Sequence, residues 1–291
     1  MLTDRMGDIN RLIKNGKKFK TVLSTCVCAV AMTACVNGLP GNGSNKPVSG
    51  PVAAKNDDAE PASFTRDGDY IIFGHYEQDG DTSNGPEPIE WEVLDEYDGG
   101  MLLISRYILD AVPYNTEKID ITWEKSSIRY WLNEDFYYDA FDADEQRGIV
   151  KVKLSNPYNA CWGTKGGNDT EDHVFLLSAE ELQKYYSFDT WYDEKMYGYS
   201  QTLLTGYTQQ AKNNGLDTYT ITQEKYDTEM AAYGYDESCI GLQHGAWWLR
   251  SPGYIGCRAC LVARYGAGGW GYEGLVTFDY NGVRPAIYIK L

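Results

Sequence analysis

The stretch Ile89-Glu90-Trp91-Glu92-Val93-Leu94-Asp95-Glu96-Tyr97-Asp98-Gly99-Gly100-Met101-Leu102-Leu103-Ile104 predicts a β-hairpin. Its first five residues alternate apolar and acidic side chains, which is the period of a strand with one solvated face. Asp98-Gly99-Gly100 is a turn signal, and the apolar run Met101–Ile104 after it predicts a buried strand. A further strand is expected just before this hairpin, at Tyr70–Phe73. The fold therefore begins with antiparallel pairing.

Helical patterns follow the hairpin. Trp123–Leu132 carries apolar residues at the i, i+3 and i+4 positions counted from Ile128, with Thr122 or Ser126 available as N-cap. A strand is predicted at His173–Leu177. It runs into Ser178-Ala179-Glu180-Glu181, whose serine and last glutamate have the spacing of a capping box, so a second helix is expected there.

The last hundred residues show shorter and weaker patterns. The region from Trp191 to Ser238 is rich in Tyr, Thr, Gly and Asp and predicts irregular structure with one short helix at Tyr207–Lys212. Three short strands are then expected, at Leu261-Val262, Leu275–Phe278 and Ile287–Leu291. The predicted fold class is α+β, with short helices, β-hairpins and extensive loops.

The N-terminus has the pattern of an export signal. Lysines precede the apolar run Thr21–Ala34, which is shorter than the roughly 20 residues that a membrane-spanning helix needs. The run ends in Met32-Thr33-Ala34-Cys35, which resembles a lipobox and implies lipid attachment at Cys35; an ordinary secretory signal is the alternative. The predicted organisation is a signal peptide over residues 1–34, a flexible Gly-, Pro- and Asn-rich tether over 35–64, and one domain over 65–291.

The charge balance argues against one class of partner. The chain has 42 acidic and 26 basic residues and a formal net charge of −16. Nucleic-acid binding depends on Lys and Arg that neutralise phosphates, so no nucleic-acid partner is expected. The acidity instead favours solubility of an exported protein.

The sequence lacks the motifs of common catalytic and metal sites. The sequence contains no Gly-x-Ser-x-Gly, Walker, dinucleotide-binding or His-Glu-x-x-His motif. Asp79–Glu90 follows the spacing of an EF-hand loop only superficially, because Asn84 replaces the glycine at its sixth position, so a polar hairpin loop is expected. No catalytic residue, metal or cofactor is predicted.

Four cysteines follow Cys35. Cys161, Cys239, Cys257 and Cys260 could form two disulfides or remain reduced, and the sequence leaves the pairing open. Cys257 and Cys260 form a single Cys-x-x-Cys pair that lacks the second ligand pair of a structural zinc site.

Six blocks of sequence, in order, resemble a domain family of unknown function that is common in exported proteins of anaerobic bacteria. The blocks are Phe73-Gly74-His75-Tyr76-Glu77-Gln78-Asp79, Pro88-Ile89-Glu90-Trp91-Glu92-Val93-Leu94, Ile128-Arg129-Tyr130-Trp131-Leu132-Asn133, Val174-Phe175-Leu176-Leu177-Ser178, Trp247-Trp248-Leu249-Arg250-Ser251-Pro252-Gly253 and Gly282-Val283-Arg284-Pro285-Ala286. The last two blocks also resemble the C-type lectin-like fold of retroelement variable proteins and formylglycine-generating enzymes. That resemblance implies a C-type lectin-like domain.

The stretch between those two closing blocks mixes Tyr, Trp, Arg and Gly, the residue types that carry binding energy at interfaces. The predicted ligand-binding residues are Tyr254, Ile255, Arg258, Arg264, Tyr265, Trp270 and Tyr272; the alternative is that they pack on the domain. Residues expected to hold the fold are Trp247, Trp248, Arg250 and Arg284, with each guanidinium pairing a buried carboxylate.

Together these observations predict a lipid-anchored protein of the cell envelope, facing outside the cytoplasmic membrane. It is expected to bind an unknown protein or glycan without catalysis. Two alternatives are an exported enzyme, either a thiol or copper oxidase that uses Cys257 and Cys260 or a carbohydrate hydrolase, and an adhesion module that associates with itself.

Overall fold

The computed structural model describes residues 51–54, 59–186, 189–190 and 198–291. The predicted signal peptide, Cys35 and residues 35–50 and 55–58 of the predicted tether lie outside the described residues, as does part of the segment predicted to be irregular. Strands and short helices alternate along the described chain, so the fold class is α+β, as predicted. Within the described residues no helix is long and apolar enough to span a membrane.

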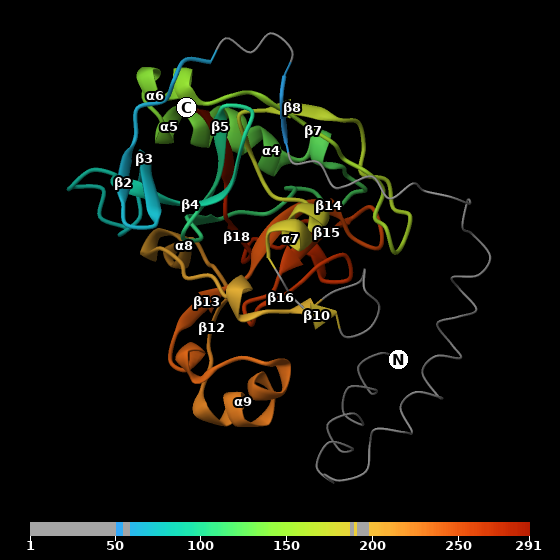
Figure 1. Ribbon diagram of the computed structural model, residues 1–291. Helices are drawn as coiled ribbons and strands as arrows, with labels where there is room; N and C mark the ends of the chain where they lie inside the picture. The colour runs from blue at the N-terminus through green and yellow to red at the C-terminus, as the bar shows by residue number, and fades with distance from the viewer. Residues whose placement is uncertain (1–50, 55–58, 187–188, 191–197) are drawn as a thin grey trace. The chain divides into compact units, whose positions relative to one another are not determined.

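The largest sheet contains the predicted hairpin (Figure 1). Its strands, in spatial order, are β2 (Thr65–Asp67), β3 (Tyr70–Tyr76), β4 (Glu87–Tyr97), β5 (Gly100–Ser105), β19 (Ala286–Lys290) and β9 (Val174–Phe175). Strands β4 and β5 pair as far as Tyr97 and Gly100, and both residues between them have positive φ, 49° at Asp98 and 76° at Gly99. That is the geometry of a two-residue hairpin turn, for which Asp-Gly is a favoured sequence. The hairpin prediction is confirmed.

A second sheet has five strands, in the order β17 (Glu273–Leu275), β15 (Arg258–Val262), β14 (Trp247–Pro252), β18 (Gly282–Val283) and β6 (Asp110–Ala111). The two closing sequence blocks meet here, because β14 pairs with β18 in parallel at Trp247 and Gly282. The predicted strand Leu275–Phe278 is wrong beyond Leu275. Phe278 N donates to Leu275 O, 3.0 Å away, so the chain turns there and Val276 is buried within the turn.

The remaining strands of the described chain form three small sheets. The first contains β1 (Val52–Ala53), β7 (Val152–Leu154) and β8 (Thr170–Asp172), and the second contains β10 (Asp189–Thr190), β11 (Gly198–Tyr199) and β16 (Ala267–Gly268). The third pairs β12 (Thr218–Thr220) with β13 (Gln243–Gly245). The helices are α4 (Ser127–Trp131), α5 (Tyr137–Ala140), α6 (Ala143–Gly148), α7 (Ala179–Tyr185), α8 (Gln209–Asn213) and α9 (Gln223–Thr228). Short 3-10 segments are η1 (Trp123–Lys125), η3 (Gln201–Leu203), η4 (Met230–Tyr233) and η5 (Glu237–Cys239), and η2 (Leu132–Phe136) is a π-helix.

The first predicted helix is divided. Ser126 has extended backbone angles, so it ends η1 and caps α4, and its hydroxyl accepts from Arg129 N at 3.3 Å. The second helix begins as predicted, because Ser178 and Glu181 form both hydrogen bonds of a capping box. Sequence analysis missed α9, which packs on a small separate core and lies in a lobe away from α4–α6 in Figure 1. That core contains Ile221, Met230, Tyr235 and Cys239.

Part of the predicted tether belongs to the folded domain. Ala62 N donates to Lys290 O at 2.8 Å, and Glu60 N donates to Arg147 O at 2.8 Å. Phe64 is partly buried against the main core. Residues 59–64 are therefore fixed by backbone hydrogen bonds that a polar, aperiodic composition gives no sign of.

Two partly or fully buried histidines predict acid sensitivity. Burial lowers the pKa of His244 from 6.5 to about 4, and its Nδ1 has no hydrogen-bond partner in the described structure. Burial is the main reason why the pKa of His173 is lowered to about 4, and the positive charge of Lys151 lowers it further. An unfolded chain therefore binds protons that the folded chain does not, so stability is complete above pH 6.5 and falls as the pH drops toward 4.

For His244, which is 3% exposed, we expect a loss of about 2 kcal/mol between pH 7 and 5. Urea unfolding at a series of pH values measures it. The matched comparison is the H244Q variant, in which the slope between pH 7 and 5 should be shallower; an unchanged slope would contradict the prediction.

Candidate ligand-binding surface

Three loops that are far apart in sequence meet at one place. Ile121 N donates to Gly256 O at 2.9 Å, and Thr164 Oγ1 donates to Tyr254 O at 2.8 Å. The rings of Trp162 and Tyr254 contact edge to face, with centroids 6.2 Å apart. Gly256 allows this close approach, because a Cβ there would lie 2.6 Å from a side-chain atom of the neighbouring loop. Residues 117–121, 158–165 and 254–258 thus form one surface.

A buried amide holds the middle loop in place. Asn159 is 1% exposed, and its Nδ2 donates to Pro252 O at 2.8 Å and Trp270 O at 3.3 Å. Its Oδ1 accepts from the backbone amides of Cys161 and Trp162, at 2.9 and 3.1 Å. Because one side chain satisfies four backbone groups, the loop has a defined position on the end of β14.

Large hydrophobic side chains gather on these loops. Of eleven such residues that are exposed in the described chain, five belong here: Ile119, Tyr158, Trp162, Tyr254 and Ile255, with exposures between 40% and 60%. We call these five residues the aromatic loop surface. Such grouping of exposed apolar side chains on a soluble domain is typical of an interaction site.

Arg258 lies at the edge of this surface. It is half-buried, makes an ion pair with Glu273 at 3.5 Å, and its guanidinium lies 5.7 Å from the centre of the Tyr254 ring. The Tyr254 amide also donates to the Glu273 carboxylate. Burial raises the pKa of Glu273, and the Tyr254 amide and Arg258 oppose that rise. These contacts fix the base of the 254–258 loop.

Three other predicted binding residues lie elsewhere. Arg264 and Tyr265 follow β15, whereas Tyr254 precedes it, and a five-residue strand separates its ends by about 13 Å. Arg264 forms an ion pair with Asp217. Tyr265 stacks with Tyr199 and contacts Tyr272 edge to face. The predicted set of ligand-binding residues is therefore divided between two ends of a strand.

Trp270 does not belong to any binding surface. It is 3% exposed and packs in the main core, and its backbone carbonyl accepts from Asn159. Its prediction as a ligand contact is thus corrected. A tryptophan among glycines has no periodicity to show which way it points, and here the indole fills the core beneath β15 and β16.

The residues expected to hold the fold are buried. Trp247, Trp248 and Arg284 are each at most 2% exposed, and the Trp248 indole donates to Val112 O at 3.1 Å. Arg284 pairs with Glu92 at 2.8 Å and also donates to Ser105 O, which ties the last block to strands β4 and β5.

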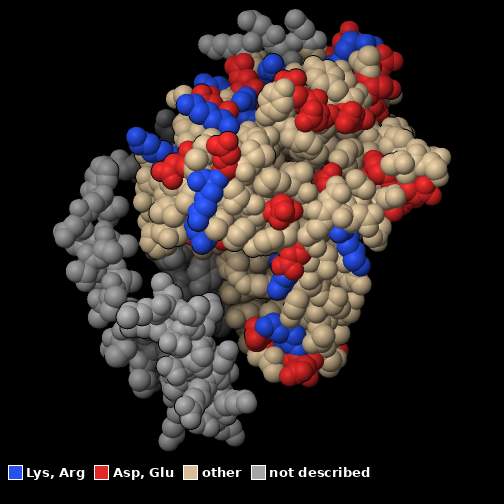
Figure 2. Space-filling view, turned by 180° about the vertical axis from the view of Figure 1, so that it is seen from behind, with Lys and Arg blue, Asp and Glu red and all other residues tan. Residues whose placement is uncertain are grey.

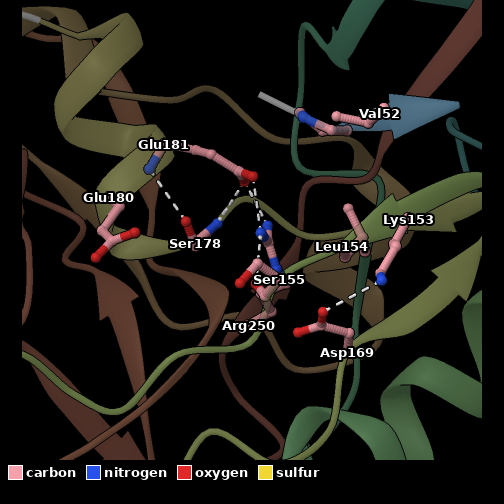
Figure 3. Close-up of a pocket in the computed structure, with 10 residues that line it drawn as sticks. Val52, Lys153, Leu154, Ser155, Asp169, Ser178, Glu180, Glu181 and Arg250 are labelled. Atoms are coloured by element: carbon pink, nitrogen blue, oxygen red, sulfur yellow. Dashed lines mark hydrogen bonds and ion pairs between the residues drawn. The ribbon is translucent and has the colours of Figure 1, made fainter. Parts of the chain in front are cut away.

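Arg250 fastens α7 to the second sheet (Figure 3). Its guanidinium makes two contacts with the Glu181 carboxylate and donates to Leu176 O at 2.9 Å. The side chains of both ion-pair partners are at most 4% exposed. Next to them, Ser251 Oγ accepts from Ala179 N at 3.0 Å. Arg250 and Ser251 of the Trp-Leu-Arg-Ser block thus bind the N-terminal end of α7.

The same residues border a small pocket of about 150 Å³ between α7, β7 and the N-terminal strand β1. Figure 3 shows Glu181 pointing toward Arg250, whereas Glu180 points away from it. Burial is the main cause that raises the pKa of the Glu180 carboxyl, and the negative charge of Glu181 raises it further. Across the pocket, Lys153 and Asp169 form an ion pair at 3.6 Å. The Nε of Arg250 has no hydrogen-bond partner in the described structure. The volume of the pocket is nevertheless below the ~300 Å³ at which ligand pockets usually begin.

Comparison with known proteins supports the expected membership in a domain family of unknown function. The model of a family described as Domain of unknown function (DUF6273) matches residues 98–291. The chain belongs to this family. No curated protein and no solved structure matches it. The matched DUF6273 region contains β5 through β19, and therefore all three loops of the aromatic loop surface.

Two of the four cysteines in the DUF6273 region, Cys239 and Cys260, are buried. Cys239, Cys257 and Cys260 are free thiols, so Cys257 and Cys260 are not joined to each other. Burial raises the pKa of the Cys260 thiol well above its ordinary value, and its Sγ lies 3.2 Å from Pro252 O. A raised pKa leaves little reactive thiolate at neutral pH.

An acidic group lies before the matched region. Glu77, Asp79 and Glu87 bring carboxylate oxygens within 4.8 Å of one another. Loop amides already use all three side chains. Gln78 N donates to Glu87, Gly80 N donates to Glu77 and Asp81 N donates to Asp79, each at 2.7 Å. Because the carboxylates stabilise their own turn, the polar hairpin loop expected from the sequence accounts for them.

Proposed function

We propose that this domain binds a protein ligand through the aromatic loop surface. The observation that carries the proposal is the convergence of three loops that together expose Ile119, Tyr158, Trp162, Tyr254 and Ile255. Tyrosine, tryptophan and arginine are the side chains most often found at binding hot spots. The buried Asn159 and the partly buried Glu273 hold the loops before a ligand arrives, which lowers the entropic cost of binding.

A protein ligand suits this surface better than a glycan. The side chains of Ile119 and Ile255 cannot form hydrogen bonds. Ile119 is 47% exposed and Ile255 is 40% exposed. Apolar side chains of a protein partner can cover these aliphatic surfaces closely, whereas the many hydroxyls of a sugar would lose water next to them without gaining hydrogen bonds. On the face shown in Figure 2, Lys and Arg are interspersed with Asp and Glu, which supports the expectation that nucleic acid is not the partner.

We also propose that the domain has a C-type lectin-like fold and is held at the cell envelope by a lipid on Cys35, facing outside the cytoplasmic membrane. The parallel pairing of β14 with β18, which joins the two blocks that resemble that fold, supports the first part. The lipobox-like sequence before Cys35 supports the second. Detection of a diacylated Cys35 in the membrane fraction by mass spectrometry tests the anchor, and an intact N-terminus in the soluble fraction would contradict it.

The binding proposal is tested by selecting peptides from a displayed peptide library on the full-length chain. The W162A and Y254A substitutions should each lower the affinity for the selected peptides by about thirtyfold, as expected for hot-spot residues. Their melting temperatures should match the parent, because both side chains are about half exposed.

Tyr130, which lies outside the three loops, supplies the control: the Y130A variant should bind the selected peptides normally. The proposal would be contradicted if the W162A and Y254A substitutions left the affinity for the selected peptides unchanged. If a second copy of the chain is the natural partner, light scattering should show a dimer that either substitution dissociates.

A further inference from the structure

A groove bordered by α4, η2, α5 and the strand β8 lies apart from the aromatic loop surface. It has a volume of about 390 Å³, compared with about 150 Å³ for the pocket beside Arg250. That volume falls within the roughly 300–1,000 Å³ typical of pockets that hold small ligands. The residues that border it are hydrophilic or aromatic, so it is a hydrated groove and not a gap in the core.

The floor of the groove is rigid. Asp172 has no exposed side-chain surface, and its carboxylate accepts from Arg129 Nε at 2.7 Å, Trp123 Nε1 at 2.9 Å and Thr170 Oγ1 at 2.8 Å. A buried carboxylate with this many donors is fully satisfied, so it positions the groove and is not available to a ligand.

One wall contains the π-helical segment η2, and Asn133 explains why it is there. Its Nδ2 donates to Val174 O at 2.8 Å and to Arg129 O at 3.1 Å, while its Oδ1 accepts from His173 N at 2.9 Å and Val174 N at 3.2 Å. The side-chain amide thus pairs with the edge of β9 as a neighbouring strand would. π-Helical turns are often found at functional sites, where they place side chains that a regular helix could not.

Two tyrosines stand at the border of the groove. Tyr130 and Tyr138 are 66% and 62% exposed, the highest values among the large hydrophobic side chains of the described chain. Among the described residues neither phenol oxygen has a hydrogen-bond partner. An exposed ring next to a hydrated groove offers a flat apolar face together with a polar hydroxyl. Sugar rings have the matching pattern, with apolar C–H groups on one face and hydroxyls around the edge.

The charges of the groove also select for an uncharged, hydroxyl-rich ligand. Lys125 and Lys151 face the same space as Glu134 and Glu171, so neither sign dominates. A phosphate would meet the glutamates, and a cation would meet the lysines. Sugar hydroxyls suit both, because a hydroxyl donates to a carboxylate and accepts from an ammonium group.

We propose that the groove beside α4 and η2 binds a neutral oligosaccharide, with the rings of Tyr130 and Tyr138 stacking on sugar faces and Lys151 and Glu171 bonding to hydroxyls. The site is separate from the proposed protein-binding loops and takes a different class of ligand. The two proposed sites can therefore be tested independently, because a substitution in the groove should leave protein binding by the aromatic loop surface unchanged.

The test uses isothermal titration of the full-length chain with five neutral probes: cellotetraose, maltotetraose, chitotetraose, mannotetraose and xylotetraose. We expect at least one to bind. For that probe, Y130A and Y138A should each lower affinity about tenfold or more, by analogy with the alanine substitution of other stacking residues. Y130F keeps the ring and should bind within about threefold of the parent.

The control for fold is the Y158A variant, which changes an equally exposed tyrosine of the aromatic loop surface and should bind the probe normally. Melting temperatures of all variants should agree, because more than half of each replaced side chain is in solvent. Failure of all five sugars to bind at millimolar concentration would overturn the proposal, as would binding that Y130A and Y138A leave unchanged. Tetragalacturonate is titrated as an acidic comparison, and its binding without that of any neutral sugar would also overturn the proposal, since that outcome requires a basic site.

Discussion

The R250A variant is expected to lose about 3–5 kcal/mol of unfolding free energy, the cost typical of removing one partner from a buried ion pair. The substitution leaves the Glu181 carboxylate, whose side chain is only 4% exposed, without its cationic partner. It also removes donors from Leu176 O and Ser155 O. Domains of this size are usually stable by only ~5–15 kcal/mol, so such a loss is a large fraction of the total.

Urea unfolding followed by tryptophan fluorescence measures the effect, and the midpoint should fall sharply. The matched control is E180Q, which changes the neighbouring glutamate that points away from Arg250 (Figure 3). It should change stability by no more than about 0.5 kcal/mol. If R250A were as stable as E180Q, the ion pair would not be fastening α7, and the Trp-Leu-Arg-Ser block would need another explanation.

The W270A variant is expected to lose about 3–5 kcal/mol, whereas Y254A should change stability by no more than about 0.5 kcal/mol. Both residues belong to the stretch that sequence analysis assigned to ligand binding. Trp270 is 3% exposed in the core, so truncation leaves a cavity; Tyr254 is 47% exposed, so truncation mainly removes surface. Thermal and urea unfolding of the two variants, compared side by side, separate the two roles.

If Tyr254, Arg258, Tyr265 and Trp270 were all surface contacts for a ligand, substituting the four together would leave the stability of the domain unchanged. The structure predicts that this quadruple variant unfolds easily, and that Trp270 is the cause. A quadruple variant as stable as the parent would show that the indole is not packed in the core.

The parts of the fold that sequence predicted are those set by neighbours along the chain. The hairpin at Asp98-Gly99 depends on a local turn, and the start of α7 depends on Ser178 and Glu181, three residues apart. Elements set by distant partners were missed or misjudged. The π-helical segment η2 exists because Asn133 pairs with the edge of β9, about forty positions later in the chain. No helical periodicity contains that information.

The candidate surface was only half predictable for the same reason. Tyr254 and Ile255 lie in a glycine-rich stretch whose composition pointed to binding, and they are exposed. Trp162 was missed, because its importance comes from contact with Tyr254 across more than ninety residues of chain. A possible signal was Asn159, a polar residue between apolar neighbours in a glycine-rich loop, but only the structure shows that its amide is buried.

The last strand of the chain has a consequence for how the domain is made. Strand β19 lies between β5 and β9 and pairs with both, although it is synthesised after them. Until β19 has emerged from the ribosome, β5 and β9 have unpaired edges that could join those of another unfinished copy. The largest sheet can therefore close only after β19 has been synthesised, and a nascent chain that ends before β19 is exposed to aggregation through these two edges.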